Sequence, residues 1–463
     1  MMKRFVKKNF LSAVVLLAIA AGCSTIKKAR EAQKIHAARA AEISSVKQAK
    51  NFDLTNATLA ELVDFALTNK PSVIKASLAV QTAELNLKEA SSGRYPQING
   101  SVGYSRATAN KKHGSGSWRT SDSPSASIGV DLLIYDFGRI SAKEAEAREQ
   151  LVAAQQALAE EKLKTREEVQ EAVFSLRRGD ALLAVARTNE VQYARHLEQA
   201  QKRYNAQVAK KLDVTQARMN LSNAKLTLIS ASNETVTASA VLTAALGLTA
   251  DEITRATLLR EDENPIANLK SVRLDPTAWT PVEALALAQT NSPALKVARA
   301  KLRAASARVD YAIADLFPEL SLNSAVNFSD PSFPATWNWS WGVRFVQSVF
   351  TGFRKTVLVD EAVIAMRQAE RDLAVCEQDL SRQITLAVAT RDTARQSFST
   401  AKVVLSQAKE NLDLALKQYS HGVISSIDLL DAESSYNSAL GEYVKAAYVE
   451  QIAEAVLYRL VGI

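Results

Sequence analysis

Two segments of this chain repeat the same pattern of residues at a fixed separation, and this repetition limits what the chain can fold into. Residues 203–217 read RYNAQVAKKLDVTQA, and residues 418–432 read QYSHGVISSIDLLDA. Aligning them pairs Tyr204 with Tyr419, and the same offset of 419 − 204 = 215 holds along the segment. The chain is therefore predicted to be a tandem duplication of one structural unit.

A second pair of segments shows where each unit begins. Residues 58–76, TLAELVDFALTNKPSVIKA, align without gaps with residues 280–298, TPVEALALAQTNSPALKVA. Each segment predicts a short helix, an Asn-x-Pro break and a second helix that ends before Pro96 or Pro318, because proline cannot continue a helix. The predicted division of the chain is repeat 1 at 52–247, an inter-repeat segment at 248–279 and repeat 2 at 280–463.

Each unit continues with two stretches of alternating apolar and polar residues, a pattern typical of strands with one apolar face. The first unit predicts a β-hairpin at about 97–136, with a long loop at 106–124 that is rich in Gly, Ser and charged residues. The second predicts a hairpin at about 319–349, with a shorter loop. Its return strand carries three tryptophans on one face, which is more typical of the aromatic girdle of a membrane barrel than of a soluble sandwich. They are Trp337, Trp339 and Trp341.

The predicted strands are long enough for a membrane but too few to close a barrel. A tilted strand of about ten residues crosses the hydrocarbon layer, and the smallest transmembrane barrels have about eight strands. Two hairpins supply four strands, and an open edge in lipid leaves backbone groups unpaired. Closure therefore requires several copies, and three chains are the economical symmetric solution.

A long helix follows each hairpin. The helical pattern is uninterrupted at about 140–206 and at about 355–419, and each of these helices would be about 100 Å long. A tight turn and a return helix complete each unit. In the second turn, Ser425 and Asp428 have the spacing of a capping box. Asp431 lies one helical turn further on the same face, so Asp428 is either a helix cap alone or part of a functional pair with Asp431.

The N-terminus has the features of a secretory signal peptide. A basic start precedes an apolar run from Phe10 to Ala21, which is too short to cross a bilayer as a helix. The small residues before Cys23 resemble a bacterial lipobox, and Ser24 resembles the sorting residue of outer-membrane lipoproteins. We expect a lipoprotein signal at 1–22 and a tether at 23–51 with lipid on Cys23. An ordinary signal peptide with a chance cysteine is the alternative.

Composition argues against nucleic-acid binding and catalysis. The net charge is +8, but Lys and Arg alternate with Glu and Asp along the helices and form no aromatic-interleaved basic face. The four histidines have no metal-ligand spacing, and the chain has neither a phosphate-binding loop nor a nucleophile arrangement. We expect no enzymatic activity, cofactor or metal.

The combined motifs resemble the TolC-type outer-membrane efflux channels. The resemblance rests on the duplicated units, on Tyr-Asp-Phe-Gly-Arg at 135–139 and on the turn at 418–432, and it covers about residues 52–463. Because of Cys23, the chain is similar to the lipoprotein branch of this family, which serves multidrug pumps. The resemblance implies a mixed α+β membrane protein. It also implies a homotrimer, in which a twelve-stranded outer-membrane β-barrel, four strands per chain, continues into a helical periplasmic tunnel.

The resemblance also implies roles for residues of the two helical turns. Asp428 and Asp431 would line the periplasmic aperture of the closed tunnel, and Tyr419 would bond Asp213 to keep it shut. The first repeat has Gln216 at the position of Asp431. We therefore expect an acidic ring from the helical hairpin of the second repeat alone. The residues of the tip turns are Tyr204, Gly422 and Val423.

The function implied is a passive exit duct for small molecules, gated by a periplasmic adaptor and driven by an inner-membrane pump. Type I protein secretion is the alternative, because the same duct serves both processes. A lipid-anchored coiled coil without a pore is a third interpretation, which explains the helices but not the alternating strands.

Overall fold

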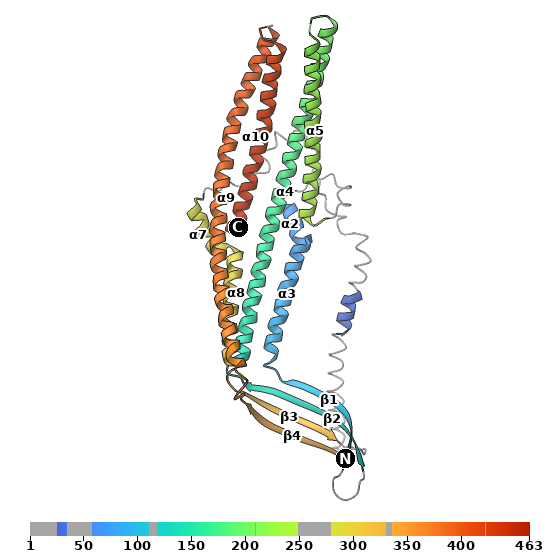
Figure 1. Ribbon diagram of the computed structural model, residues 1–463, viewed down its shortest axis with the longest axis vertical. Coiled ribbons are helices and arrows are strands. Elements are labelled where there is room, and N and C mark those ends of the chain that lie inside the picture. Colours follow the sequence, from blue (N-terminus) through green and yellow to red (C-terminus); the bar gives the residue numbers. More distant parts are fainter. Residues whose placement is uncertain are drawn as a thin grey trace.

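The chain forms an elongated molecule with a β-sheet at one end and a bundle of long helices that runs away from it (Figure 1). The computed structural model describes residues 26–34, 58–110, 118–208, 210–248, 279–329, 336–421 and 423–463. Cys23, Gly422 and nearly all of the expected inter-repeat segment lie outside the described residues.

The helices have the same lengths, in the same order, in both halves of the chain. In each half, helices of 11, 22, 67 and 36 residues follow one another, and the two strands lie between the second and third helices. The first half contains α2 (Leu59–Asn69), α3 (Pro71–Ser92), α4 (Arg139–Asn205) and α5 (Lys211–Leu246). The second contains α7 (Pro281–Asn291), α8 (Pro293–Ala314), α9 (Arg354–Ser420) and α10 (Ser426–Val461).

Local sequence explains where the short helices begin and end. Thr58 and Glu61 form a capping box at the start of α2, and the equivalent residues Thr280 and Glu283 do so at α7. Proline is the first residue of α3 and of α8, where its missing N–H costs no helical hydrogen bond.

The long return helices end on these breaks. Gly247 terminates α5 in the left-handed conformation, with φ +76°, and Gly462 terminates α10 with φ +85°. A β-carbon at Gly247 would lie 2.9 Å from Cα of Lys70, and one at Gly462 would lie 3.0 Å from the carbonyl carbon of Asn291. The end of α5 is therefore seated on the α2–α3 break, and the end of α10 on the α7–α8 break.

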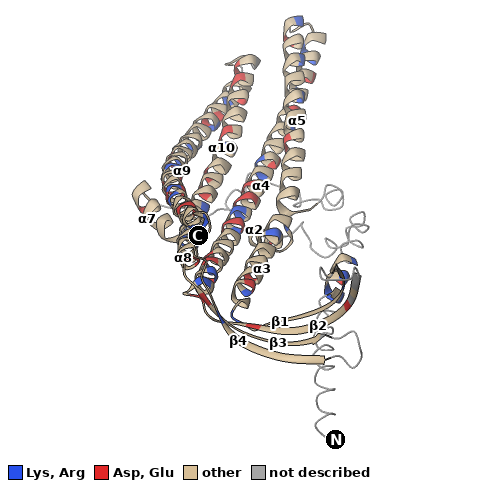
Figure 2. Ribbon diagram, turned by 60° about the horizontal axis from the view of Figure 1, so that its bottom comes forward, with Lys and Arg blue, Asp and Glu red and all other residues tan. Residues whose placement is uncertain are grey.

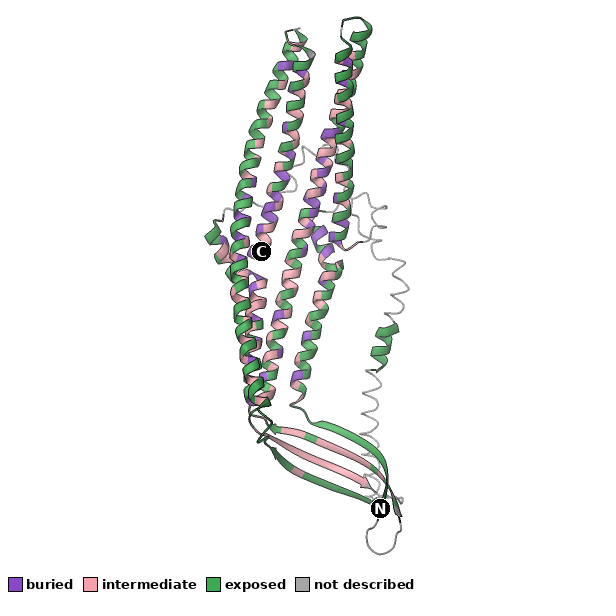
Figure 3. Ribbon diagram, in the orientation of Figure 1, coloured by how far each residue is buried: buried purple, intermediate pink, exposed green. Residues whose placement is uncertain are grey.

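The strands form one antiparallel sheet in the order β1-β2-β3-β4. Its strands are β1 (Gln97–Asn110), β2 (Trp118–Tyr135), β3 (Glu319–Ser329) and β4 (Thr336–Val346). The two hairpins are joined by pairing of β2 with β3, so β1 and β4 are open edges, and both lie exposed in Figure 3.

The register places apolar residues of all four strands on one face. One row across the sheet is Gly100, Ile128, Val326 and Trp339, each paired with the next. This face is open to solvent in the single chain; for example, Val102 is 90% exposed. The predicted alternation is thus present, and it leaves a large apolar surface uncovered.

The loop predicted at 106–124 is wrong in its extent. Residues 106–110 pair with residues 118–122 in β1 and β2, and only 111–117 lie between the strands, outside the described residues. The segment has no apolar face to reveal a strand, and it is held instead by polar contacts, including Tyr104 with Asp122 at 2.8 Å and Thr108 with Thr120 at 3.2 Å. The helix offset falls from 293 − 71 = 222 before the hairpin to 354 − 139 = 215 after it, so the first hairpin is longer by 222 − 215 = 7 residues.

The helix bundle is organised around α4. This helix packs against α3 and α8 near the sheet and against α5 and α10 further away, whereas α9 packs against α8 and α10. Its contacts are made largely by small side chains, since alanine dominates the buried residues. Among the described residues, no helix is both long and apolar enough to cross a membrane.

Gly247 offers a test of how the helix ends are seated. Replacing Gly247 with Ala forces a left-handed backbone on a residue with a side chain, which costs about 1–2 kcal/mol, and brings Cβ against Lys70. We expect a lower midpoint of thermal unfolding by circular dichroism. Gly441→Ala is the control, because Gly441 is helical and a β-carbon there meets only Leu182 Cδ2 at 3.9 Å. An equal effect of both substitutions would contradict the proposed seating.

Candidate functional site

The turn between α9 and α10 is closed by backbone and side-chain hydrogen bonds. The N–H of Val423 donates to the carbonyl of Gln418 at 2.9 Å, which caps the end of α9. At the start of α10, the Ser425 hydroxyl accepts from the N–H of Asp428 at 3.3 Å, and the Asp428 carboxylate accepts from the N–H of Ser425 at 2.9 Å. The predicted capping box is therefore present.

The Asp428 carboxylate is occupied by this cap. It accepts a further hydrogen bond from the Ser425 hydroxyl at 2.7 Å. The hydrogen bonds from the side chain and then the backbone of Ser425 lower the pKa of Asp428 below its usual value, because they stabilise the charged form. Asp428 is exposed but held in place.

Asp431 has a different environment. Its carboxylate has no hydrogen bond or ion pair within the part of the chain that the structure describes, and the residue is exposed. It lines a groove of about 670 Å³ between α5 and α10, with α4 behind it and many asparagine and serine side chains along it. Gln216, the equivalent position in the first half, lines the same groove. Asp431 is thus the carboxylate of this turn that is available to a solute.

The first turn is strained where the second has a glycine. Gln207 has φ +62°, in the left-handed region that side chains rarely adopt. Subtracting the offset, 422 − 215 = 207, shows that Gln207 stands at the position of Gly422. Its N–H donates to the carbonyl of Tyr204 at 2.9 Å, which holds the turn closed.

The expected bond between Tyr419 and Asp213 is not formed in the single chain. Arg203 Nη2 donates to the Tyr419 hydroxyl at 2.7 Å, and the guanidinium carbon lies 5.8 Å from the centre of the Tyr419 ring. Asp213 is engaged in its own helix, where it accepts from the N–H of Lys210 at 3.0 Å. Within the single chain, Tyr419 therefore joins α9 to α4 through Arg203.

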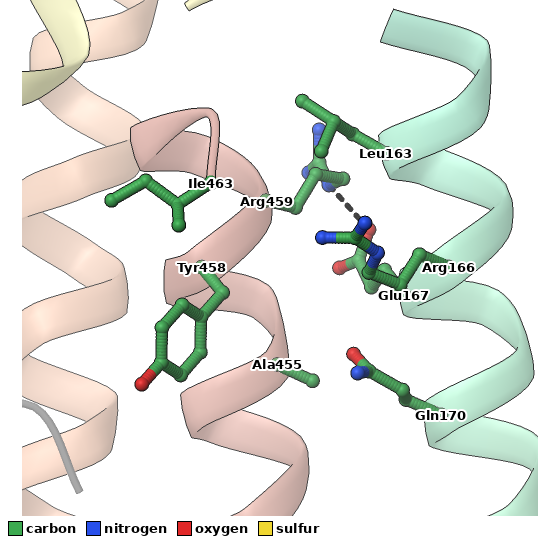
Figure 4. Close-up of a pocket in the computed structure, with 8 residues that line it drawn as sticks. All are labelled: Leu163, Arg166, Glu167, Gln170, Ala455, Tyr458, Arg459 and Ile463. Atoms are coloured by element: carbon green, nitrogen blue, oxygen red, sulfur yellow. Dashed lines mark ion pairs between the residues drawn. The ribbon is translucent and has the colours of Figure 1, made fainter. Parts of the chain in front are cut away.

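Further polar contacts join α4 to α10 below the turns. His196 Nε2 lies 2.7 Å from the Glu433 carboxylate, and the Asn437 amide donates to Gln192 at 3.4 Å. Nearer the end of α10, Arg459 contacts Glu167, as Figure 4 shows beside a small pocket of about 280 Å³.

Burial acts against the charge of Glu167. Burial raises its pKa, although Arg459 acts in the opposite direction and nearby glutamates add to the rise. Sequence reasoning missed Arg203, His196 and Glu433 because each partner lies more than 200 residues away and no local pattern marks the pair.

Charge is distributed differently over the two parts of the molecule. Lys and Arg interleave with Asp and Glu along the long helices, whereas the strands are almost free of charged residues (Figure 2). On the apolar face of the sheet, Trp337, Trp339 and Trp341 are between 57% and 66% exposed. The Trp339 indole N–H donates to the Ser324 hydroxyl at 2.9 Å. An exposed apolar sheet beneath charged helices suits a lipid layer beside an aqueous compartment.

The sequence matches the family described as outer membrane efflux protein over residues 62–248 and 284–463, which include most of the helices and all four strands. The chain belongs to this family. As an outer membrane efflux protein it resides in the outer membrane, in agreement with its exposed apolar sheet.

Curated members of the family are similar over most of their length. The cation efflux system protein CusC of Escherichia coli strain K12 is 24% identical over 414 residues, which cover 87% of this chain and 85% of CusC. The outer membrane protein OprJ of Pseudomonas aeruginosa is 24% identical over 88% of this chain and 85% of OprJ. A third relative, of Salmonella typhimurium, is named as the probable outer membrane lipoprotein SilC and is 21% identical over 87% of this chain and 85% of SilC.

Solved structures of this type share the fold. A crystal structure of CusC has a TM-score of 0.74 and 22% identity, covering 90% of this chain and 95% of that one. The CmeC outer membrane channel of Campylobacter jejuni has a TM-score of 0.76 and 16% identity, over 87% and 85% of the two chains. At these identities the likeness establishes the fold alone.

The strain at Gln207 gives a test of the first turn. Gln207→Gly removes the cost of a left-handed side-chain residue and should stabilise the turn by about 1 kcal/mol, because glycine adopts positive φ freely. Asn should have an intermediate effect and Ala none. Amide hydrogen exchange of the peptide that contains residues 203–213 measures the change. Faster exchange in the Gly variant than in the Ala variant would contradict the strain.

Proposed function

We propose that three copies of this chain form a passive exit duct through the outer membrane. In this arrangement, three sheets of four strands close a twelve-stranded barrel, and the long helices form a tunnel through the periplasm. Each chain contributes two tandem units of helices and a hairpin. The observation that carries the proposal is the four-stranded sheet with two open edges and one exposed apolar face.

The open edges favour assembly. Within hydrocarbon, each unpaired backbone group costs several kcal/mol, and neither β1 nor β4 has a partner on its outer side. Pairing β1 of one copy with β4 of the next satisfies both edges, and it continues the apolar face around the outside. The polar face, which carries Asp131, Asn323 and Arg344, then lines the interior.

The dimensions support a duct across two compartments. Strands of 11 residues rise about 36 Å, enough to cross a hydrocarbon layer of about 30 Å when tilted. Helices of 67 residues extend about 100 Å beyond it. The tryptophans of β4 would lie at the membrane interface, where aromatic side chains concentrate.

We place the narrow end at the two helical turns. Three copies of Asp428 and Asp431 would bring six carboxylates to the aperture. The negative charge gathered there would attract cations. Because Asp428 is held by its cap, Asp431 is the carboxylate expected to act on solutes. The contact of Arg203 with Tyr419 would hold the two helical hairpins of a chain together in the closed state.

The partners are proposed from the relatives. Those described above include an efflux system component, and others are named as solvent and toluene efflux pump outer membrane proteins. The chain has no phosphate-binding loop, so energy would come from an inner-membrane pump through a periplasmic adaptor. These names favour small solutes over type I protein secretion, and relatives solved as channels disfavour a coiled coil without a pore. Lipid on Cys23 would add an anchor, as in the relative named a lipoprotein.

Planar bilayer recording tests the duct and its aperture. Purified wild-type protein should give small, cation-selective steps. Asp431→Asn should lower the preference for K⁺ over Cl⁻ more than Asp428→Asn does, because only the Asp431 carboxylate is free. The double variant should lose most of the selectivity.

A matched control is Asp413→Asn, an exposed carboxylate on α9 before the turn. Its selectivity should equal that of the wild type. Unchanged selectivity in the double variant would mean that neither aspartate acts on the solutes that pass. A folded trimer without conductance in the wild type and in Arg203→Gln would argue against a pore.

A further inference from the structure

Within one chain, the helical hairpin formed by α4 and α5 meets the helical hairpin formed by α9 and α10 where α4 packs against α10. Leu182 of α4 covers Gly441 of α10, and a β-carbon at Gly441 would lie 3.9 Å from Leu182 Cδ2. Phe174 of α4, two turns from Leu182, and Val444 of α10, one turn from Gly441, are fully buried in the cluster that Leu182 packs against. This seam, called the inner seam here, therefore has Leu182 opposite Gly441, with Phe174 and Val444 buried beside this contact.

The same positions in the other two long helices face outward. Adding 215 to the α4 positions gives Ser397 and Ala389 on α9, and subtracting 215 from the α10 positions gives Leu226 and Ile229 on α5. The α9 residues line an open groove of about 340 Å³ beside α10. The α5 residues are a ridge, 65% and 66% exposed respectively.

Large and small side chains change places between the inner seam and the equivalent outward-facing positions of α9 and α5. Where the inner seam has Leu182 opposite Gly441, the outward positions have Ser397 and Leu226. The small side chain is now on α9 and the large one on α5. A ridge of this kind fits a groove of this kind, whereas two ridges or two grooves would clash or leave a void.

We propose that Leu226 and Ile229 of one copy insert into the groove beside Ser397 and Ala389 of the next copy. This outer seam rests on the proposed trimer and gives it a specific helical contact. The inner seam supports a second copy as the occupant of the groove. Within the chain, the equivalent face of α4 is covered by α10. The helix in the same position of the other unit is α5, which has the same length.

The charges of the two seams differ as well. In the inner seam, His196 lies against Glu433, but the equivalent outward residues are Asn411 and Arg218. Arg459 pairs with Glu167, but the residue equivalent to Arg459 is Ala244. The outer seam therefore lacks these ion pairs and depends on the fit of apolar and small side chains.

Crosslinking tests the contact directly in the full-length protein. In a Cys376→Ala background, Ser397→Cys together with Leu226→Cys should give dimers and trimers on a denaturing gel after treatment of membranes with a short bismaleimide. The control pair is Ser406→Cys with Leu226→Cys. Ser406 is equivalent to Val191, which stays 47% exposed although α4 is flanked on both sides, so this pair should crosslink at most one tenth as well.

Exchange of side-chain size tests the fit. Ser397→Leu should place two leucines in one space and lower the yield of trimer at least threefold in size-exclusion chromatography of detergent extracts. Adding Leu226→Gly recreates the leucine and glycine of the inner seam and should restore the trimer. Ser406→Leu, the same substitution outside the seam, should have no effect.

The outcomes separate the seam from the duct. A trimer of normal mass without crosslinks between 226 and 397 overturns the seam and leaves the duct intact. A wild-type protein that is monomeric in mild detergent overturns both. Protection of both cysteines by a copurifying periplasmic protein, without crosslinks between copies, would assign the groove to an adaptor and overturn the proposal.

Discussion

Backbone hydrogen bonding in hydrocarbon is the constraint on which this molecule depends. A sheet of four strands with an apolar face belongs in lipid, but there its two edges leave N–H and carbonyl groups without water or a partner. In the proposed trimer the neighbouring copies supply these partners, so the assembly and not the single chain would be the stable unit. The proposed trimer gives the exposed tryptophans and the open edges one explanation, because lipid would cover the tryptophans and neighbouring copies would pair with the edges.

The helical part solves a different problem. In the proposed duct, helices that line a tunnel cannot converge on one compact core, so each would be held by its neighbours on either side. Alanine and glycine allow close approach of the helices, and the largest buried clusters lie where the short helices α2 and α7 cover α4 and α9. Away from these clusters the inner seam depends on polar pairs such as His196 with Glu433. Exposed charge on the same helices makes their surface compatible with water.

Local patterns predicted the elements well and the long-range contacts poorly. The Asn-x-Pro breaks, the glycine ends and the capping box at Ser425 depend on neighbouring residues, so they could be recognised in the sequence. The outer part of the first hairpin was not recognised as strand, because polar side chains on both faces produce no alternation. The contact of Tyr419 with Arg203 in the single chain is not predicted from the sequence, because it depends on how α4 and α9 approach each other, which no local signal encodes. Asp428 and Asp431 were identified together, but only their surroundings separate a cap from a free carboxylate.

The continuity of α4 and α9 has a mechanical consequence. Each begins in a turn at the sheet, where Arg139 contacts Glu319 at 2.5 Å and so joins the start of α4 to the other half of the chain. From there each helix runs without a break to the turn at its far end, so a tilt at the sheet would carry the whole helix with it. For a rod of about 100 Å, a tilt of about 5° at the sheet moves the far end by about 9 Å. In the proposed duct, a rearrangement of a few side chains at the sheet would thereby be amplified into a displacement about as wide as a hydrated solute.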